Sequence, residues 1–100
     1  MIKDINQKLN IFDLSNKVAI VIGGGGYLCS EIARGYAKSG AHVVILDIRE
    51  EKAKKISNEI NLATSTKKSS YFSVDVANKS SIKAALNNIL KIHKNVDIVV

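Results

Sequence analysis

The sequence predicts an α/β fold in which helices cover a parallel β-sheet, and three observations favour that class. Short apolar runs rich in branched residues alternate with segments that repeat an apolar residue every three to four positions. The runs are apolar at successive positions, as strands buried on both faces are. A row of glycines follows the first run. Alternating strands and helices require right-handed crossovers, so we expect about four parallel strands and about three helices in three layers.

The apolar runs are the predicted strands. Polar residues or glycine bound them, and the polar stretch 64–70 (TSTKKSS) is expected to form a surface loop. The predicted strands are 17–22 (KVAIVI), 41–48 (AHVVILDI), 71–76 (YFSVDV) and 96–100 (VDIVV).

Three stripes of apolar residues predict the helices between these strands. Asn78 precedes the third stripe and is expected to be its N-cap, and Glu50 and Glu51 suit the first turn of the second helix. The stripes are Leu28, Ile32 and Tyr36 with Ala33 and Ala37; then Ala53, Ile56 and Ile60; then Ile82, Ala85, Leu86, Ile89 and Leu90.

The glycine run, Gly23 to Gly26, lies between the first strand and the first helix. An open α/β sheet binds ligands at this edge, and a helix N-terminus attracts phosphate. Read as G-x-G-x-x-G, Gly24 and Gly26 fit, and the small residue Cys29 takes the third position. The run therefore predicts a dinucleotide-binding loop rather than a hinge. At Gly25 we expect that a side chain would block the pyrophosphate and would also oppose a positive φ.

Asp47 ends the second predicted strand, 21 positions after Gly26. A carboxylate there can accept hydrogen bonds from the adenosine ribose and repels a 2′-phosphate, so NAD is favoured over NADP. Arg49 favours NADP, because a nearby basic side chain can bind the 2′-phosphate. The residue directly after Asp47 is the uncharged Ile48, which keeps NAD the favoured coenzyme. The same carboxylate can instead cap the helix that starts near Arg49.

Several of these segments together resemble the N-terminal half of a short-chain dehydrogenase/reductase. The resemblance covers about residues 11 to 100 and rests on FDLSNKVAIVIGGGG, LDIREEKAKKISNEI, SVDVANKSSI and VDIVV. It implies a Rossmann-type fold, NAD(P) binding, and hydride transfer between nicotinamide and a carbonyl or alcohol carbon. Carried over by position, it implies pyrophosphate contacts at Gly23, Gly25, Gly26 and Leu28, a ribose contact at Asp47, and adenine contacts at Asp75 and Val76. Tyr27, inside the loop, is expected either to cover the cofactor or to pack at the domain edge.

The glycine loop departs from the pattern usual in that family. Ile22 replaces the threonine before the first glycine, and Tyr27 and Cys29 stand where later glycines are usual. A glycine run followed by an apolar residue, Leu and Cys resembles a subgroup that acts on sugar acids such as mannonate or fructuronate. The resemblance thus implies a small-molecule substrate, with a sugar acid as the finer expectation.

The catalytic groups of the family, a Ser and a Tyr-x-x-x-Lys pair, have no counterpart in this sequence. None of Tyr27, Tyr36 and Tyr71 is followed by Lys four residues later. We therefore expect no catalytic residue within 1–100 and interpret the chain as the N-terminal part of one NAD(P)-binding domain, a fragment of a longer, homo-oligomeric oxidoreductase.

Composition argues against several other classes. The formal charge is +6, but the lysines are scattered without interleaved aromatic residues, so no nucleic-acid partner is expected. No apolar run reaches the roughly 18 residues of a membrane span, and residues 1–17 show no signal-peptide core, so a cytoplasmic location is expected.

Cys29 is expected to be a packing residue rather than a reactive thiol, and His42 and His93 lack metal-ligand spacing, so no metal is expected. A non-catalytic nucleotide sensor and an S-adenosylmethionine-dependent methyltransferase remain the alternatives.

Overall fold

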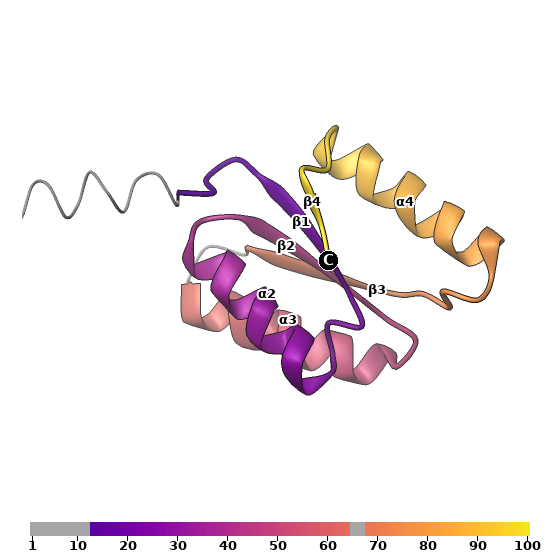
Figure 1. Cartoon of the computed structure of the whole chain (residues 1–100), viewed down its shortest axis with the longest axis horizontal. Helices are drawn as coiled ribbons and strands as arrows, with labels where there is room; N and C mark the ends of the chain where they lie inside the picture. The colour runs from indigo at the N-terminus through magenta and orange to yellow at the C-terminus, as the bar shows by residue number, and fades with distance from the viewer. Residues whose placement is uncertain (1–12, 65–67) are drawn as a thin grey trace, which may run out of the picture.

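The computed structural model describes residues 13–64 and 68–100, shown in Figure 1. The signal-peptide prediction therefore falls largely outside the described residues, as does the middle of the predicted loop 64–70. Thr64 ends a helix, and Ser69 and Ser70 belong to a strand. The elements are β1 (Val18–Ile22), α2 (Tyr27–Lys38), β2 (His42–Asp47), α3 (Glu50–Thr64), β3 (Ser69–Ser73), α4 (Lys79–His93) and β4 (Ile98–Val99).

The strands form one parallel sheet in the order β3-β2-β1-β4. In the register, Ile20 of β1 lies opposite Val44 of β2 and Val99 of β4. The predicted α/β class with parallel strands is therefore confirmed. Because β1 and β2 run in the same direction, their carboxyl ends reach one edge, where Gly23 and Asp47 meet.

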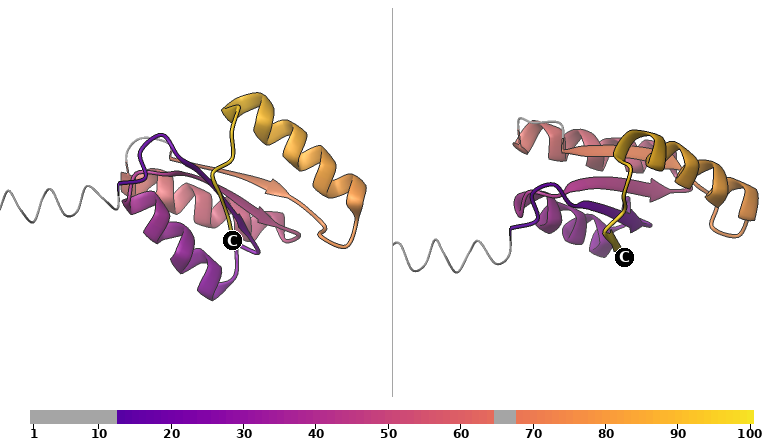
Figure 2. Two further views of the ribbon diagram at one scale, coloured as in Figure 1. Left: turned by 45° about the horizontal axis from the view of Figure 1, so that its top comes forward. Right: turned by 90° about the horizontal axis from the view of Figure 1, so that it is seen from above.

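Successive strand residues point to opposite faces, which explains why the strands are apolar throughout. On one face, Val21 and Ile45 pack with the buried residues of α2 and α3. On the other face, Ile20 and Val44 pack with α4 through residues such as Ile89. Figures 1 and 2 show this three-layer arrangement, with α2 and α3 side by side and α4 across the sheet from them.

Some element boundaries and one helix face differ from the sequence-based expectation. β3 spans Ser69–Ser73 rather than 71–76, and β4 is limited to Ile98–Val99. Leu28 was expected on the buried stripe of α2 but is 69% exposed, and the buried residues of α2 are Ser30, Ala33 and Ala37. Ser30 takes the buried position in that turn.

The predicted helix ends are confirmed. The side chain of Asn78 accepts hydrogen bonds from the backbone N–H of Ser80 at 2.9 Å and of Ser81 at 3.2 Å, which caps α4. Glu50 and Glu51 lie in the first turn of α3, where the helix dipole favours negative charge.

Candidate cofactor site

The glycine loop is a tight turn held against the end of β2. The N–H of Gly23 donates to the carbonyl oxygen of Leu46 at 2.6 Å, and the N–H of Gly26 donates back to Gly23 at 2.9 Å. Gly23 has φ +71°, a conformation that side-chain-bearing residues rarely adopt. The first glycine is thus required by the turn itself.

The middle glycines are required by packing within the protein. A Cβ on Gly24 would lie 2.7 Å from Ile45 Cγ2, and a Cβ on Gly25 would lie 2.8 Å from both Asp47 Oδ2 and Lys52 Cβ. The expectation of a positive φ at Gly25 is wrong, since the glycines with positive φ in residues 13–64 and 68–100 are Gly23 and Gly40. Gly25 is therefore required by the close approach of Asp47 and Lys52 and not by its backbone conformation. Gly24 is required for the same kind of reason, because Ile45 lies close to it.

The N-terminus of α2 presents backbone amides to solvent. Gly26 is the N-cap and has no side chain to bond them, and the first turn contains no acidic residue. The helical hydrogen bonds begin with the N–H of Ser30 donating to Gly26 at 2.9 Å, so the amides of Tyr27 and Leu28 precede that ladder. Tyr27 is 87% exposed and Leu28 is 69% exposed. Free amides and a positive dipole end suit a bound phosphate group.

Asp47 is buried at the end of β2, with 5% of its surface exposed. Its Oδ2 accepts a hydrogen bond from the N–H of Gly25 at 3.1 Å, and its Oδ1 accepts one from the N–H of Arg49 at 3.0 Å. The Arg49 guanidinium adds two more, from Nε to Oδ1 and from Nη2 to Oδ2, each at 3.1 Å. Burial acts to raise the pKa of Asp47, but the hydrogen bonds and charge of Arg49 outweigh it and lower that pKa. The carboxylate is therefore held ionised beside the glycine loop.

An open groove of about 180 Å³ lies between the ends of β1, β2 and β3. It brings together Gly23, Asp47, Asp75 and Val76, which the sequence places far apart. Four apolar residues that the sequence did not predict as site residues also line the groove: Ile22, Leu46, Ile48 and Val74. Their positions at the carboxyl ends of predicted strands are the signal that could have identified them. Gly25, Gly26, Tyr27 and Leu28 do not line this groove and belong to the adjoining loop and helix end.

Asp75 and Val76 form the far wall of the groove. Both are exposed, Val76 at 59%. The Asp75 side chain accepts a hydrogen bond from the N–H of Ala77 at 3.0 Å, and its backbone N–H donates to Ser81 Oγ at 3.0 Å. These bonds fix the turn between β3 and α4 and leave an acceptor oxygen of Asp75 for a ligand amino group.

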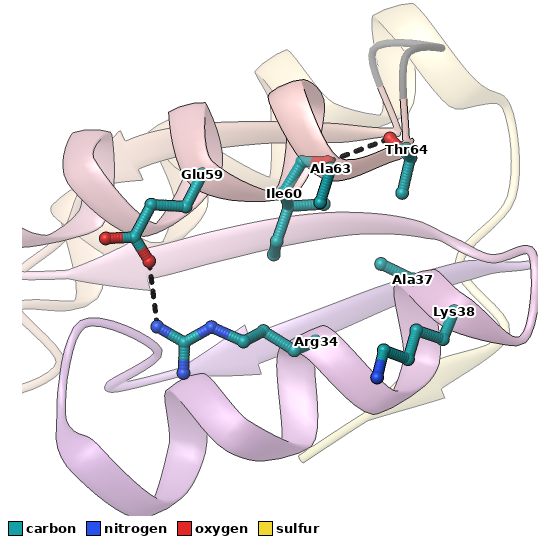
Figure 3. A pocket seen from close by; sticks show the side chains of 7 residues that line it. All are labelled: Arg34, Ala37, Lys38, Glu59, Ile60, Ala63 and Thr64. Atoms are coloured by element: carbon teal, nitrogen blue, oxygen red, sulfur yellow. Dashed lines mark hydrogen bonds and ion pairs between the residues drawn. The ribbon is translucent and has the colours of Figure 1, made fainter.

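A second cavity, of about 200 Å³, lies between α2 and α3 on the outer layer (Figure 3). Arg34 and Glu59 form an ion pair at 2.8 Å across it, and Ala37 and Ile60 are among its apolar lining residues. None of the site residues predicted from the sequence lines this cavity. The residues that combine phosphate-binding geometry with an acidic group are at the sheet edge instead.

The remaining candidates lie away from the sheet edge or pack within the core. Cys29 is half-buried and packs against the core cluster under α2. His42 and His93 lie with ring centroids 4.3 Å apart, and His42 Nε2 is 3.2 Å from Ser70 Oγ. Within residues 13–64 and 68–100, no cluster of three or more potential metal ligands occurs. In the same part of the chain, no helix has the length and apolar character needed to cross a bilayer.

Comparison with known proteins agrees with this geometry. Sorbitol-6-phosphate 2-dehydrogenase from Escherichia coli (strain K12) is 33% identical over 85 residues, which are 85% of this chain and 33% of that protein. A protein from Haemophilus influenza, assigned as a D-mannonate oxidoreductase and solved with bound NAD, has a TM-score of 0.82 at 33% identity, over 92% of this chain and 32% of its own. A metagenomic short-chain oxidoreductase in complex with NADP has a TM-score of 0.81 at 28% identity, over 87% of this chain and 38% of its own.

This chain spans between 32% and 38% of the length of these proteins. Its residues 17–100 match the family described as short chain dehydrogenase. With the parallel sheet and the glycine loop in the expected places, the chain belongs to the short-chain dehydrogenase family.

Proposed function

We propose that this chain is the coenzyme-binding N-terminal part of an NAD(P)-dependent oxidoreductase. The observation that carries the proposal is the hydrogen bond at 3.1 Å between the Gly25 amide and the Asp47 carboxylate. This hydrogen bond joins the glycine loop, which we propose binds phosphate, to the acidic residue at the end of β2. A dinucleotide requires both sites at a fixed spacing, because pyrophosphate and ribose are parts of one molecule.

The loop and the first turn of α2 suit the pyrophosphate. Gly26 leaves the helix end open, and the amides of Tyr27 and Leu28 can donate to phosphate oxygens. Gly23 forms the turn that brings the backbone to this position. A Cβ on Gly26 would lie 3.3 Å from the carbonyl oxygen of Gly23 and 3.8 Å from Arg49 Nη2. Tyr27 is 87% exposed, which supports the proposal that its ring covers a bound coenzyme.

The groove beside the loop suits adenosine. Asp47 would accept hydrogen bonds from the ribose hydroxyls. Asp75 would accept a hydrogen bond from the adenine amino group, and the backbone at Val76 would line the edge of the adenine ring. The apolar walls Ile48 and Val74 would contact the flat faces of the base. We propose NAD as the preferred coenzyme because Asp47 is ionised and repels a 2′-phosphate.

When bound, the nicotinamide would exchange a hydride with a carbon of the substrate. The residues of this chain bind and orient the coenzyme, and we place the catalytic Ser and Tyr-x-x-x-Lys in the longer protein.

Relatives named for D-mannonate and sorbitol-6-phosphate support a sugar acid or sugar alcohol as the substrate. A cytoplasmic location and a homo-oligomeric full-length protein remain predictions.

Calorimetric titration of the full-length protein tests the proposal. NAD and ADP-ribose should bind with similar micromolar affinity, since both contain the adenosine and pyrophosphate that this chain contacts. S-adenosylmethionine, which has no pyrophosphate, should not compete with them. Competition by S-adenosylmethionine, or no binding of either dinucleotide probe, would refute the proposed function.

A further inference from the structure

A polar pocket of about 310 Å³ lies at the amino ends of the strands, at the opposite edge of the sheet from the candidate cofactor site. We call it the amino-edge pocket. The titratable residues that line it are all basic: Lys17 precedes β1, His42 opens β2, Lys68 precedes β3 and His93 ends α4. Because parallel strands begin at one edge of a sheet, the fold brings together four basic side chains that the sequence places far apart.

The two histidines of the amino-edge pocket lie side by side, and one of them lacks a hydrogen-bond partner. The ring centroids of His42 and His93 are 4.3 Å apart, and His42 Nε2 is 3.2 Å from Ser70 Oγ. Within residues 13–64 and 68–100, the buried Nε2 of His93 has no partner. A buried polar atom without a partner costs free energy. A ligand oxygen in the pocket that His93 lines would supply that partner.

No acidic side chain lines the amino-edge pocket. Among the described residues, neither Lys17 nor Lys68 forms an ion pair. Two carboxylates lie nearby but outside the lining. Asp13 acts on Lys68 only through its charge, and Asp97 accepts a hydrogen bond from the backbone N–H of Val18 at 2.9 Å. The lysine charges of the pocket are therefore left for a ligand.

The positive potential of the amino-edge pocket acts on His42. Burial, followed by the charges of His93 and Lys68, lowers the pKa of His42 to about 4. An anion in the pocket would oppose these charges and would favour the protonated ring. The last carbonyl groups of α4 also lie at this edge and carry partial negative charge. The side chains, and not a helix end, must therefore hold an anion here.

We propose that the amino-edge pocket is a second anion site, which binds a phosphate group independently of the coenzyme. Lys17 and Lys68 donate to phosphate oxygens and balance the charge, and each imidazole can donate a ring N–H. A phosphate group fits this set because it carries a charge of about −1.5 to −2 and three acceptor oxygens. The pocket volume leaves room for the rest of a small phosphorylated molecule.

Calorimetry on the full-length protein tests this proposal. NAD is present in excess, so that the glycine loop at the other edge does not bind the probe. Sulfate is the first probe, because it remains a dianion between pH 5.5 and pH 7.5. The double variant Lys17→Ala/Lys68→Ala should bind sulfate about tenfold more weakly than the parent, or worse. The matched control Lys54→Ala/Lys55→Ala, which removes two exposed charges from α3, should bind it like the parent.

The pH dependence gives a second readout at the same site. Sulfate affinity should rise as the pH falls from 7.5 to 5.5, because the anion binds more tightly when His42 is protonated. His42→Gln should remove most of this rise. An equal rise in His42→Gln and the parent overturns the assignment of the anion to the amino-edge pocket.

Inorganic phosphate and glycerol 1-phosphate then distinguish the sources of the phosphate group. Equal affinities indicate the free ion and tighter binding of the ester indicates a phosphorylated metabolite, and both results support the site. Absence of sulfate and phosphate binding to the parent overturns the inference. Unchanged affinity in the Lys17→Ala/Lys68→Ala variant, or an equal loss in the control, also overturns it. NAD affinity should be the same in all these proteins, so the proposed function is judged separately.

Discussion

The backbone N–H of Gly25 donates a hydrogen bond of 3.1 Å to the carboxylate of Asp47, which lies 22 residues further along the chain. This bond fixes the glycine loop to the end of β2. It also explains why Gly25 has no room for a side chain, since a Cβ would lie 2.8 Å from the same oxygen. The loop and the acidic residue are thus one structural unit.

Replacement of Asp47 by alanine should weaken NAD binding and reduce the ratio of NAD affinity to NADP affinity. The change removes the proposed ribose acceptors and the carboxylate that accepts the hydrogen bond of the Gly25 amide. A hydrogen bond to a charged group contributes about 1.5–3 kcal/mol. We expect a loss of NAD affinity of roughly tenfold to a hundredfold, measured by calorimetry on the full-length protein. Equal NAD affinity in Asp47→Ala and the parent would contradict a ribose role for this carboxylate.

Replacement of Gly25 by valine should abolish dinucleotide binding and destabilise the junction of β2 and α3. The side chain would enter the space of Asp47 and Lys52, so we expect a cost of about 1–3 kcal/mol in the free energy of unfolding. Gly35→Ala is the control, because a Cβ there has no atom within 4 Å. That exposed mid-helix change should stabilise the protein by up to about 1 kcal/mol and leave NAD binding unchanged. Parental NAD affinity in Gly25→Val would show that the loop has another role.

Asn78→Ala should lower the free energy of unfolding by about 1 kcal/mol, because it removes the acceptor for the amides of Ser80 and Ser81. Urea unfolding followed by circular dichroism measures the change. Asn78→Asp should retain most of the stability, since aspartate also caps helices well. Equal losses in the two variants would argue against a capping role.

Stability should fall as the pH drops from about 6.5 to about 4 because of His42. Burial, followed by the nearby His93 and Lys68 charges, lowers the pKa of His42 to about 4 from its ordinary value of 6.5. Between those values the unfolded chain binds a proton that the folded chain does not, so folding is disfavoured increasingly toward the acid end. Urea unfolding at pH 7.5 and pH 5 should show this difference, and His42→Gln should reduce it. The same difference in His42→Gln would assign the effect to other groups.

Residues 1–100 expressed alone should self-associate and bind NAD only weakly. β4 is an edge strand, with Val99 63% and Val100 40% exposed, and an apolar groove of about 290 Å³ beside it is lined by Leu86 and Val99. Exposed strand edges and apolar patches favour association between chains. Size-exclusion chromatography should show oligomers, and Val99→Lys should reduce them more than Leu62→Lys, which changes an exposed residue on α3. A monodisperse parental monomer with micromolar NAD affinity would contradict this prediction.

The sequence by itself determined the class of fold and the order of its helices and strands. Strand and helix periods are local properties, so the runs around Ile20 and Ile45 and the stripe through Ala85 and Ile89 identified buried elements in the correct order. Asn78 was recognisable as a cap because capping involves only the next few residues. The spacing from the glycines to Asp47 predicted a dinucleotide-binding site. The structure shows that β1 and β2, which precede the glycines and end at Asp47, are parallel neighbours in the sheet.

Only the tertiary structure decided what each site residue contacts. The clash of a Gly24 side chain with Ile45 depends on strand register and loop geometry, and no local period encodes it. Leu28 fits an apolar stripe but is exposed, and Ser30 takes the buried position in that turn of α2. The sequence left Asp47 open as a ribose acceptor or a cap, and folding surrounded its carboxylate with Gly25 and Arg49. Such contacts depend on three-dimensional distance and burial, which neighbouring residues along the chain do not specify.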